Sequence, residues 1–121
     1  MIGLGIDAVD IQRFERAMTR SPRLAQRVFT DSERDLASRR PNAAAALAAR
    51  FAVREATMKA LGVGLGAFDF HDVSLDNAPG GNPSLRVTGR AAELARQRGV
   101  TTWHVSLSHT EHLAVAVVAA D

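Results

Sequence analysis

Hydrophobic positions follow helical spacing in the first half of the chain and strand spacing mostly in its last third. Residues 2–6 interleave apolar side chains with glycine, which predicts a short strand that ends at Asp7. Residues 10–20 repeat an apolar side chain every three or four positions and predict an amphipathic helix. The chain is therefore expected to begin with a strand that is followed directly by a helix.

Capping residues indicate two further helix starts after this first helix. Ser21 and Pro22 suit the N-cap and the first helical position, and they predict a helix that continues to about Phe29. Thr30 followed by Glu33 is a capping-box pattern, in which each side chain accepts a hydrogen bond from the backbone N–H of the other residue. Another short helix is therefore expected to begin at Thr30.

The longest predicted helix runs from Asn42, its expected cap, to Gly62, since glycine commonly follows the last residue of a helix. Alanines cover most of its surface, so the helix is apolar almost all round. Its larger apolar residues share one face and predict a core stripe: Leu47, Phe51, Met58 and Leu61. Only four residues of this helix are charged, and two of them, Glu55 and Lys59, lie one turn apart.

The last third of the chain alternates strand patterns with turn residues. A turn is expected at residues 79–83, and a short amphipathic helix from Thr88 to Gly99. Strands are expected at residues 71–77, 84–87, 103–109 and 113–119, the last two forming a hairpin. Helices first and strands mostly last indicate the α+β class, as one domain over residues 1–121.

Composition is that of an ordinary globular protein, with 46% hydrophobic and 23% charged residues. The chain has no cysteine, which excludes disulfides, thiolate metal sites and a thiol nucleophile. Its first residues, MIGLGID, lack the pattern of a secretory signal, and its longest apolar run, LAVAVVAA, is too short to cross a bilayer. We therefore expect a cytoplasmic protein that does not act at a membrane.

Basic residues are concentrated in one part of the sequence. Residues 13–59 contain eleven basic and five acidic side chains, whereas the segments before and after are each net negative. This distribution favours an acidic partner or a phosphate-bearing ligand.

Glu55 and Lys59 have two possible interpretations. Lys59 is the only lysine in a chain with fourteen arginines. The two side chains could form an ordinary surface pair at i and i+4, which stabilises a helix by roughly 0.3–0.5 kcal/mol. They lie at the edge of the core stripe, so both are expected to be partly buried, and a functional role stays open.

Asp7 adds a second carboxylate from a different element. It could simply cap the next helix, or its glycine-flanked strand could let the backbone approach a ligand closely. Two carboxylates beside arginine and lysine can hold Mg²⁺ while phosphate oxygens and water complete its coordination. The neighbouring cations would stabilise charge that develops as a P–O bond breaks. Asp7, Glu55 and Lys59 therefore predict phosphoryl-type transfer without a Walker loop.

Three ordered motifs give the chain a family resemblance: GIDAVDI near its start, RFAVREATMKALG in its middle and HVSLSH near its end. In these motifs the chain resembles holo-acyl-carrier-protein synthase, the small class of 4′-phosphopantetheinyl transferase. The resemblance implies that family's fold, an antiparallel sheet with a long central helix and short helices. It also implies Mg²⁺-dependent transfer of phosphopantetheine from coenzyme A to a serine of an acyl carrier protein, with release of adenosine 3′,5′-bisphosphate. Members assemble as trimers with active sites at subunit boundaries.

The resemblance also assigns site residues. Asp7 and Glu55 would be the metal ligands and Lys59 would contact the phosphates of coenzyme A, with Glu55 as our candidate base for the serine proton. Further residues would border the cofactor: Arg50, Arg54, Gly62, Gly81, Asn82, Pro83 and His104. Two of these depart from the family pattern, because Arg54 replaces a usual lysine and Asn82 stands where a basic residue is common. A planar guanidinium does not bind as a compact ammonium does.

Three arginines near the first helix suggest a docking surface. By resemblance Arg13, Arg20 and Arg23 would meet an acidic helix of the carrier protein. Arg13 and Arg20 are seven residues apart and share a helix face, whereas the Ser-Pro break leaves the direction of Arg23 open. A merely solvated arginine face is the alternative interpretation for each residue.

A function from another class is a non-catalytic basic module that binds RNA or DNA through residues 13–54. It is disfavoured because the segment lacks interleaved aromatic residues and any known nucleic-acid motif. Three histidines near the C-terminus could suggest a zinc site. Strand alternation places His104 and His109 on opposite faces, so they are not expected to share a metal ion.

Overall fold

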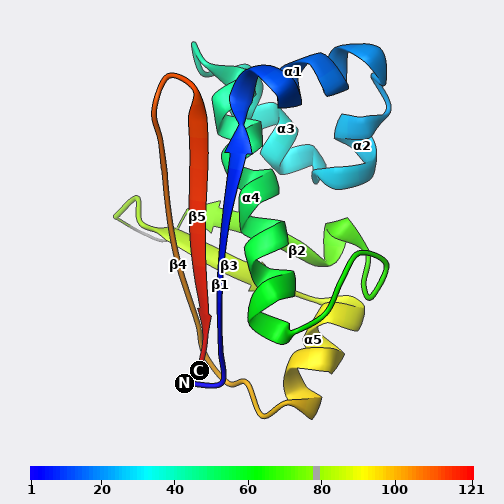
Figure 1. Cartoon of the computed structure of the whole chain (residues 1–121), viewed down its shortest axis with the longest axis vertical. Helices are drawn as coiled ribbons and strands as arrows, with labels where there is room; N and C mark the ends of the chain where they lie inside the picture. The colour runs from blue at the N-terminus through cyan, green and yellow to red at the C-terminus, as the bar shows by residue number, and fades with distance from the viewer. Residues whose placement is uncertain (78–79) are drawn as a thin grey trace.

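The longest helix, α4 (Ala43–Leu61), packs lengthwise against one face of a three-stranded antiparallel sheet (Figure 1). The computed structural model describes residues 1–77 and 80–121. The sheet has the order β1–β5–β4, formed by β1 (Gly3–Asp10), β4 (Trp103–His109) and β5 (Leu113–Ala120). The last two strands form the predicted hairpin, and β1 pairs with the other edge of β5. The predicted antiparallel sheet with a long central helix is confirmed.

Glycines in β1 allow α4 to lie unusually close to the strand. A β-carbon added to Gly3 would lie 1.8 Å from the carbonyl oxygen of Ala60, and one added to Gly5 would lie 1.8 Å from that of Ala56. The facing helix residues are alanines, which are also small. The expectation that this glycine-flanked strand admits a ligand is therefore wrong at both glycines, because the helix itself fills the space.

Three short helices gather at one end of α4 (Figure 1): α1 (Ile11–Arg20), α2 (Leu24–Val28) and α3 (Asp31–Ser38). The predicted capping box of α3 is present, with hydrogen bonds in both directions between Thr30 and Glu33. The predicted start of α2 is wrong. The N–H of Ser21 donates to Ala17 and closes α1, so Ser21 and Pro22 form a turn and α2 begins only at Leu24.

A second, two-stranded sheet covers another side of α4 and consists of β2 (Val73–Asn77) and β3 (Pro83–Val87). It is preceded by the 3₁₀ helix η1 (Phe70–Asp72). The strand predicted at residues 71–77 therefore begins two residues later than expected, at Val73. Helix α5 (Gly89–Gln97) follows β3, and the Asp72 carboxylate, not the Thr88 side chain, accepts a hydrogen bond from its first turn. Pro79 of the predicted turn lies outside the described residues.

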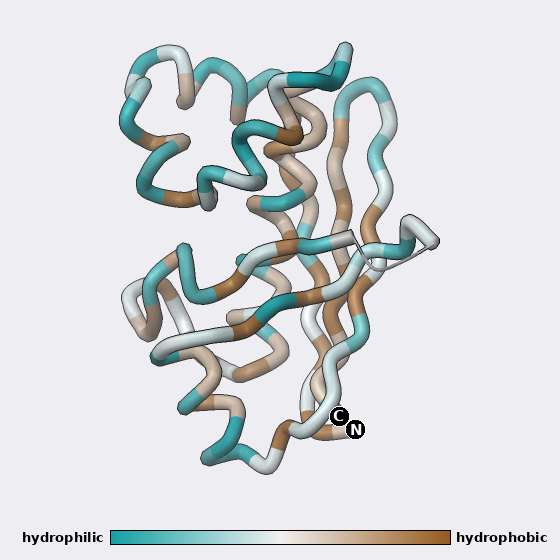
Figure 2. Tube along the Cα trace, turned by 180° about the vertical axis from the view of Figure 1, so that it is seen from behind, coloured by the Kyte–Doolittle hydropathy of each residue, from teal (hydrophilic) through white to brown (hydrophobic). Residues whose placement is uncertain are grey.

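Apolar residues line α4 and the sheet strands, whereas α1 to α3 are largely hydrophilic (Figure 2). The predicted core stripe on α4 is buried except at Phe51, which is half-buried. The face of the three-stranded sheet that points away from α4 leaves large apolar side chains exposed: Ile2, Leu4, Ile6 and Leu113. Within residues 1–77 and 80–121, no helix combines the length and hydropathy needed to cross a lipid bilayer.

Candidate active site

Asp7 lies inside β1, where its side chain faces α4. The strand continues to Asp10, so the prediction that it ends at Asp7 is wrong, and Asp7 pairs in register with Ala116 of β5. Its carboxylate is only 17% exposed. Asp10, not Asp7, caps α1 by accepting a hydrogen bond from the N–H of Arg13 at 2.8 Å. The capping interpretation of Asp7 is therefore excluded.

Lys59 crosses from α4 to β1. Its Nζ donates to the Asp7 carboxylate at 3.2 Å and to the carbonyl oxygen of Ile6 at 2.9 Å. The Lys59 side chain is 55% exposed, so the expectation that it is partly buried is wrong. Lys59 pairs with a residue of another element, which also contradicts the interpretation of Glu55 and Lys59 as a simple i, i+4 surface pair.

Glu55 lies half-buried on α4, near Asp7 and Lys59. Burial raises the pKa of the Glu55 carboxyl, the negative charge of Asp7 raises it further, and the Lys59 ammonium partly opposes the shift. Lys59 contacts Asp7 and lies one turn from Glu55 on α4, so the two carboxylates share one electrostatic environment. The structure therefore brings together all three residues that the sequence predicted for phosphoryl transfer.

The donor set of this site fits Mg²⁺. That ion usually takes one or two protein carboxylates and completes an octahedron with water and phosphate oxygens. Asp7 and Glu55 supply two carboxylates from different elements, and each repels the other until a cation neutralises them. Among the described residues no group of three or more histidine, aspartate or glutamate side chains converges, so the protein does not offer a full cage.

Arg54 does not border this site, and its predicted contact with a cofactor is wrong. Its side chain is 0% exposed and forms an ion pair with Glu33, which is 2% exposed. The guanidinium is surrounded by protein and cannot reach a ligand in solution. Arg54 can lie on a buried side of α4 because α3 places the carboxylate of Glu33 next to its guanidinium.

Arg50 lines a separate cavity of about 270 Å³ near the start of α4. Its side chain is buried, Nη1 donates to the carbonyl oxygen of Ala46 at 3.0 Å, and Nε has no hydrogen-bond partner among residues 1–77 and 80–121. Burial lowers the pKa of the Arg50 guanidinium, and the nearby charge of Glu33 opposes that effect. Arg40 and His109 also line the cavity. A buried cation with an unsatisfied N–H, beside a second arginine, suits an anionic ligand.

The two histidines of β4 have different surroundings. His104 lies near the start of β4, where it pairs with Ala119 on the face away from α4, and its Nε2 is 3.9 Å from the carboxylate of Asp121. The structure does not bring His104 to the cavity of Arg50. His109 occupies that position, and the sequence interpretation missed it. Strand alternation could have indicated it, because His109 shares the face of Leu107, which also lines the cavity.

The remaining predicted residues occupy accessible positions. Gly62 ends α4 with a φ of 70°, which confirms the predicted helix end three residues after Lys59. Gly81 is exposed in the connection from β2 to β3, and Pro83 is exposed as the first residue of β3. Arg13, Arg20 and Arg23 are all exposed, and Arg13 and Arg20 lie on α1 away from its buried residues.

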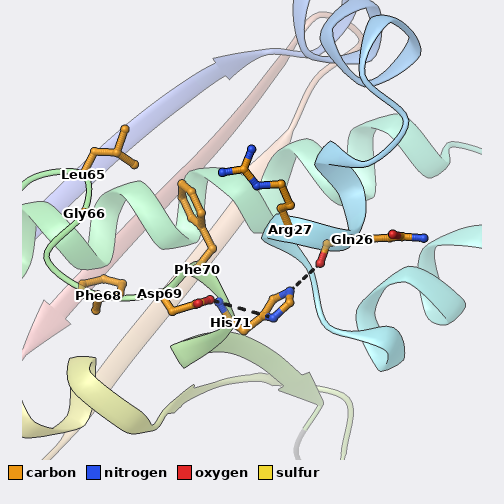
Figure 3. Close-up of a pocket in the computed structure, with 8 residues that line it drawn as sticks. All are labelled: Gln26, Arg27, Leu65, Gly66, Phe68, Asp69, Phe70 and His71. Atoms are coloured by element: carbon orange, nitrogen blue, oxygen red, sulfur yellow. Dashed lines mark hydrogen bonds and ion pairs between the residues drawn. The ribbon is translucent and has the colours of Figure 1, made fainter.

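A wider, open cavity of about 550 Å³ lies between α2 and the segment that follows α4 (Figure 3). Arg27, Phe70 and His71 line it, and Nε2 of His71 lies 2.7 Å from the carbonyl oxygen of Gln26. The Phe70 ring lies 6.1 Å from that of Phe51, one turn before Glu55 on α4. One residue of the cavity, Phe70, therefore packs against α4 one turn before Glu55.

Comparison with known proteins agrees with this arrangement. Residues 3–118 match the family model described as the 4′-phosphopantetheinyl transferase superfamily. The chain belongs to this superfamily. It is 45% identical to a holo-[acyl-carrier-protein] synthase of Salinispora arenicola over 100% of this chain and 98% of that protein.

Solved structures show the same fold. The crystal structure of the holo-[acyl-carrier-protein] synthase from Neisseria meningitidis superposes with a TM-score of 0.90, at 27% identity, covering 100% of this chain and 98% of that one. The Helicobacter pylori enzyme in complex with coenzyme A gives a TM-score of 0.84 at 29% identity, with 98% and 99% coverage. The predicted family, its fold and its enzyme class, a phosphopantetheinyl transferase, are confirmed.

Proposed function

We propose that this protein transfers the 4′-phosphopantetheine group of coenzyme A to a serine of an acyl carrier protein. The observation that carries the proposal is the convergence of Asp7, Glu55 and Lys59 from β1 and α4 in a chain of this superfamily. Support for the co-substrate comes from the Helicobacter pylori relative, which binds coenzyme A. The relatives' shared name supports a carrier protein as acceptor.

Asp7 and Glu55 are the residues that would hold Mg²⁺. When bound, the ion supplies positive charge to the diphosphate of coenzyme A and thereby stabilises the transition state. The serine oxygen attacks the phosphorus that bears the pantetheine arm, and the bond to the second phosphate breaks. The departing group is adenosine 3′,5′-bisphosphate.

Glu55 and Lys59 then have distinct roles in this proposal. Glu55 is half-buried beside Asp7 and Lys59, and its carboxylate is the candidate acceptor of the serine hydroxyl proton, directly or through a metal-bound water. Lys59 is exposed and is tethered to the Ile6 carbonyl, so its ammonium can neutralise the leaving bisphosphate without a large movement.

The proposed site is completed by a second subunit. The cavity of Arg50 and His109 shares no residue with the cluster of Asp7, Glu55 and Lys59. Arg50 and Glu55 are separated on α4 by a rotation of about 140°. When subunits associate, the Arg50 cavity of one subunit and the carboxylate cluster of its neighbour can together bind one coenzyme A. The exposed apolar residues on the outer face of the three-stranded sheet support the predicted homotrimer.

Carrier docking is assigned to the arginines of the first helices. Arg13 and Arg20 are exposed on one face of α1, and Arg23 is exposed just before α2. An acidic carrier helix would find complementary charge there, which accelerates association more than it adds affinity. A cytoplasmic location is consistent with this role and stays a prediction.

The test is a modification assay. Apo carrier protein incubated with the enzyme, coenzyme A and Mg²⁺ should gain the mass of phosphopantetheine, and EDTA should prevent the gain. Without product, but with steep salt-dependent binding of RNA or DNA, the protein would instead be a nucleic-acid-binding module. The structure offers that alternative little support, because Phe14 and Phe29 are buried and the half-buried Phe51 and Phe70 pack in the same cluster of rings.

A further inference from the structure

Glu33 and Arg54 form an ion pair that is isolated from solvent. The Arg54 side chain is 0% exposed and that of Glu33 is 2% exposed. Two hydrogen bonds join them, from Nη2 to Oε1 at 2.5 Å and from Nη1 to Oε2 at 3.0 Å. This bidentate geometry fixes the direction of both side chains, which a single contact would not do.

Each partner also binds backbone groups of other elements. Arg54 Nε donates to the carbonyl oxygen of Phe70 in η1 at 2.9 Å. Glu33 accepts from the N–H of Thr30 at 3.0 Å and from that of Leu75 in β2 at 3.3 Å. The pair therefore joins α3, α4, η1 and β2, and a change in either residue affects all four elements.

Glu33 is ionised in this environment. Burial by itself raises the pKa of the Glu33 carboxyl. The hydrogen bonds and charge of Arg54, together with the N–H groups of Thr30 and Leu75, outweigh burial and hold the pKa below its ordinary value.

The pair acts on the same helix turn that carries Glu55. Arg54 and Glu55 are consecutive, so their side chains leave α4 about 100° apart. Glu55 lies on α4 within the electrostatic influence of Asp7 on β1, whereas the Arg54 side chain contacts Glu33 of α3 and Phe70 of η1. On the β1 side α4 is held by the close backbone contacts at Gly3 and Gly5 and by the exposed Lys59 side chain, which donates to Asp7 and to the Ile6 carbonyl oxygen; none of these contacts is a buried bidentate pair.

Small rotations of α4 would change the carboxylate geometry considerably. A carboxylate lies roughly 6 Å from a helix axis, so a rotation of about 10° moves it by about 1 Å. Displacements of that size lower catalytic rates by about 10²-fold when reacting groups are misplaced.

We propose that Arg54, through its buried pair with Glu33, is a positioning residue that fixes the rotation of α4 and hence the separation of the Asp7 and Glu55 carboxylates. The inference rests on the proposed function, because it takes the carboxylate pair as the metal site. It also accounts for a guanidinium at this position, since only the fork can bind Glu33 at two points and the Phe70 carbonyl at once.

Two variants of Arg54 test the proposal. Arg54→Met removes the charge and all four hydrogen bonds of the guanidinium, two to Glu33 and one each to the carbonyl oxygens of Phe70 and Arg50, whereas Arg54→Lys keeps a cation that can reach Glu33. The control for stability is Leu94→Ala, which opens a cavity under α5 and lowers the melting temperature without touching the pair. The control for charge is Arg39→Met, which breaks an exposed pair with Asp35.

The measurements are Mn²⁺ affinity, by electron paramagnetic resonance with saturating coenzyme A and no carrier, and steady-state kinetics with carrier. Arg54→Met should weaken Mn²⁺ binding at least tenfold and lower kcat at least tenfold, with KM for coenzyme A within threefold. Arg54→Lys should give intermediate values of both, because its ammonium keeps the charge beside Glu33 but cannot reproduce the bidentate contact and the hydrogen bond to Phe70. Both controls should bind Mn²⁺ as the wild type does, even where the melting temperature falls.

A folded Arg54→Met protein with wild-type Mn²⁺ affinity and kcat would overturn the positioning role. If Arg54→Met does not fold, Glu33→Gln, which keeps the side-chain shape, is measured in its place with the same expectation and the same overturning result. A wild-type protein that modifies no carrier would overturn the proposed function itself. That outcome differs from the one in which the wild type modifies the carrier and the Arg54 variants have wild-type Mn²⁺ affinity and kcat.

Discussion

Gly5→Ala is expected to be strongly destabilising, because this glycine is where β1 touches α4. The added β-carbon would lie 1.8 Å from the carbonyl oxygen of Ala56, whereas ordinary carbon–oxygen contacts begin at about 3.3 Å. Strand and helix must therefore separate by about 1.5 Å along a rigid backbone contact. Overpacked cores typically lose 1–3 kcal/mol, and a backbone-to-backbone clash should reach at least about 3 kcal/mol. For a domain of this size, that corresponds to a fall in melting temperature of about 10 °C or more.

The assay is thermal and urea unfolding followed by circular dichroism. Gly64→Ala is the matched control, because a β-carbon at Gly64 meets nothing within 4 Å and its backbone is not in the left-handed region. The control should unfold within a few degrees of the wild type. A Gly5→Ala protein as stable as the Gly64→Ala protein would refute the close packing of α4 on β1, and with it the geometry that brings Glu55 to Asp7.

Three further predictions concern charged residues. Glu55→Gln should reduce carrier modification at least about 10²-fold, since a positioned base contributes about 10²–10⁴. It should not lower the melting temperature, because the pKa of Glu55 is raised by folding and its charge disfavours the folded state at neutral pH; retained activity would remove Glu55 from the mechanism. Arg13→Glu combined with Arg20→Glu should raise KM for the carrier and leave KM for coenzyme A unchanged, with Arg90→Glu on α5 as a control; an unaltered carrier KM would exclude docking on α1. The pKa of Glu33 is lowered in the folded state, so its contribution to stability is present above the ordinary carboxyl pKa and is lost as the pH falls through the folded value. Urea titrations from pH 7 to pH 3 should therefore show less acid destabilisation in Glu33→Gln than in the wild type, and parallel curves would contradict this assignment.

Periodicity and capping residues predicted most of the fold. The long helix from Ala43 to Leu61, its glycine end at Gly62 and the C-terminal hairpin follow from local pattern, because each is stabilised by neighbours in the sequence. The start of α2 did not follow. Ser21 satisfies the end of α1 instead of the start of the next helix, and either use is compatible with the same residue type.

The carboxylate pair and Lys59 could also be found from the sequence, because their chemistry is specific. The partner of each charge could not be predicted. Lys59 binds Asp7 on β1 and not Glu55, which is four residues away on the same helix. Arg54 forms its buried ion pair with Glu33, which is 21 residues away. Both outcomes depend on how α3 and β1 pack around α4. Sequence spacing alone does not contain that information.

Gly3 and Gly5 show a second feature that the sequence alone could not explain. Glycines beside a carboxylate indicate close approach, but the sequence does not say what approaches. Here it is the backbone of α4 at Ala56 and Ala60. The glycines therefore serve the site indirectly, by letting the helix that carries Glu55 lie against the strand that carries Asp7.

The account depends on Asp7 and Glu55 binding the same divalent ion. The most direct measurement is anomalous diffraction from crystals of the protein grown with coenzyme A and Mn²⁺. We predict one manganese peak within about 2.0–2.3 Å of an oxygen of each carboxylate, with the diphosphate and water completing its coordination. A peak bound to only one of the two residues, or located elsewhere in the assembly, would contradict the account.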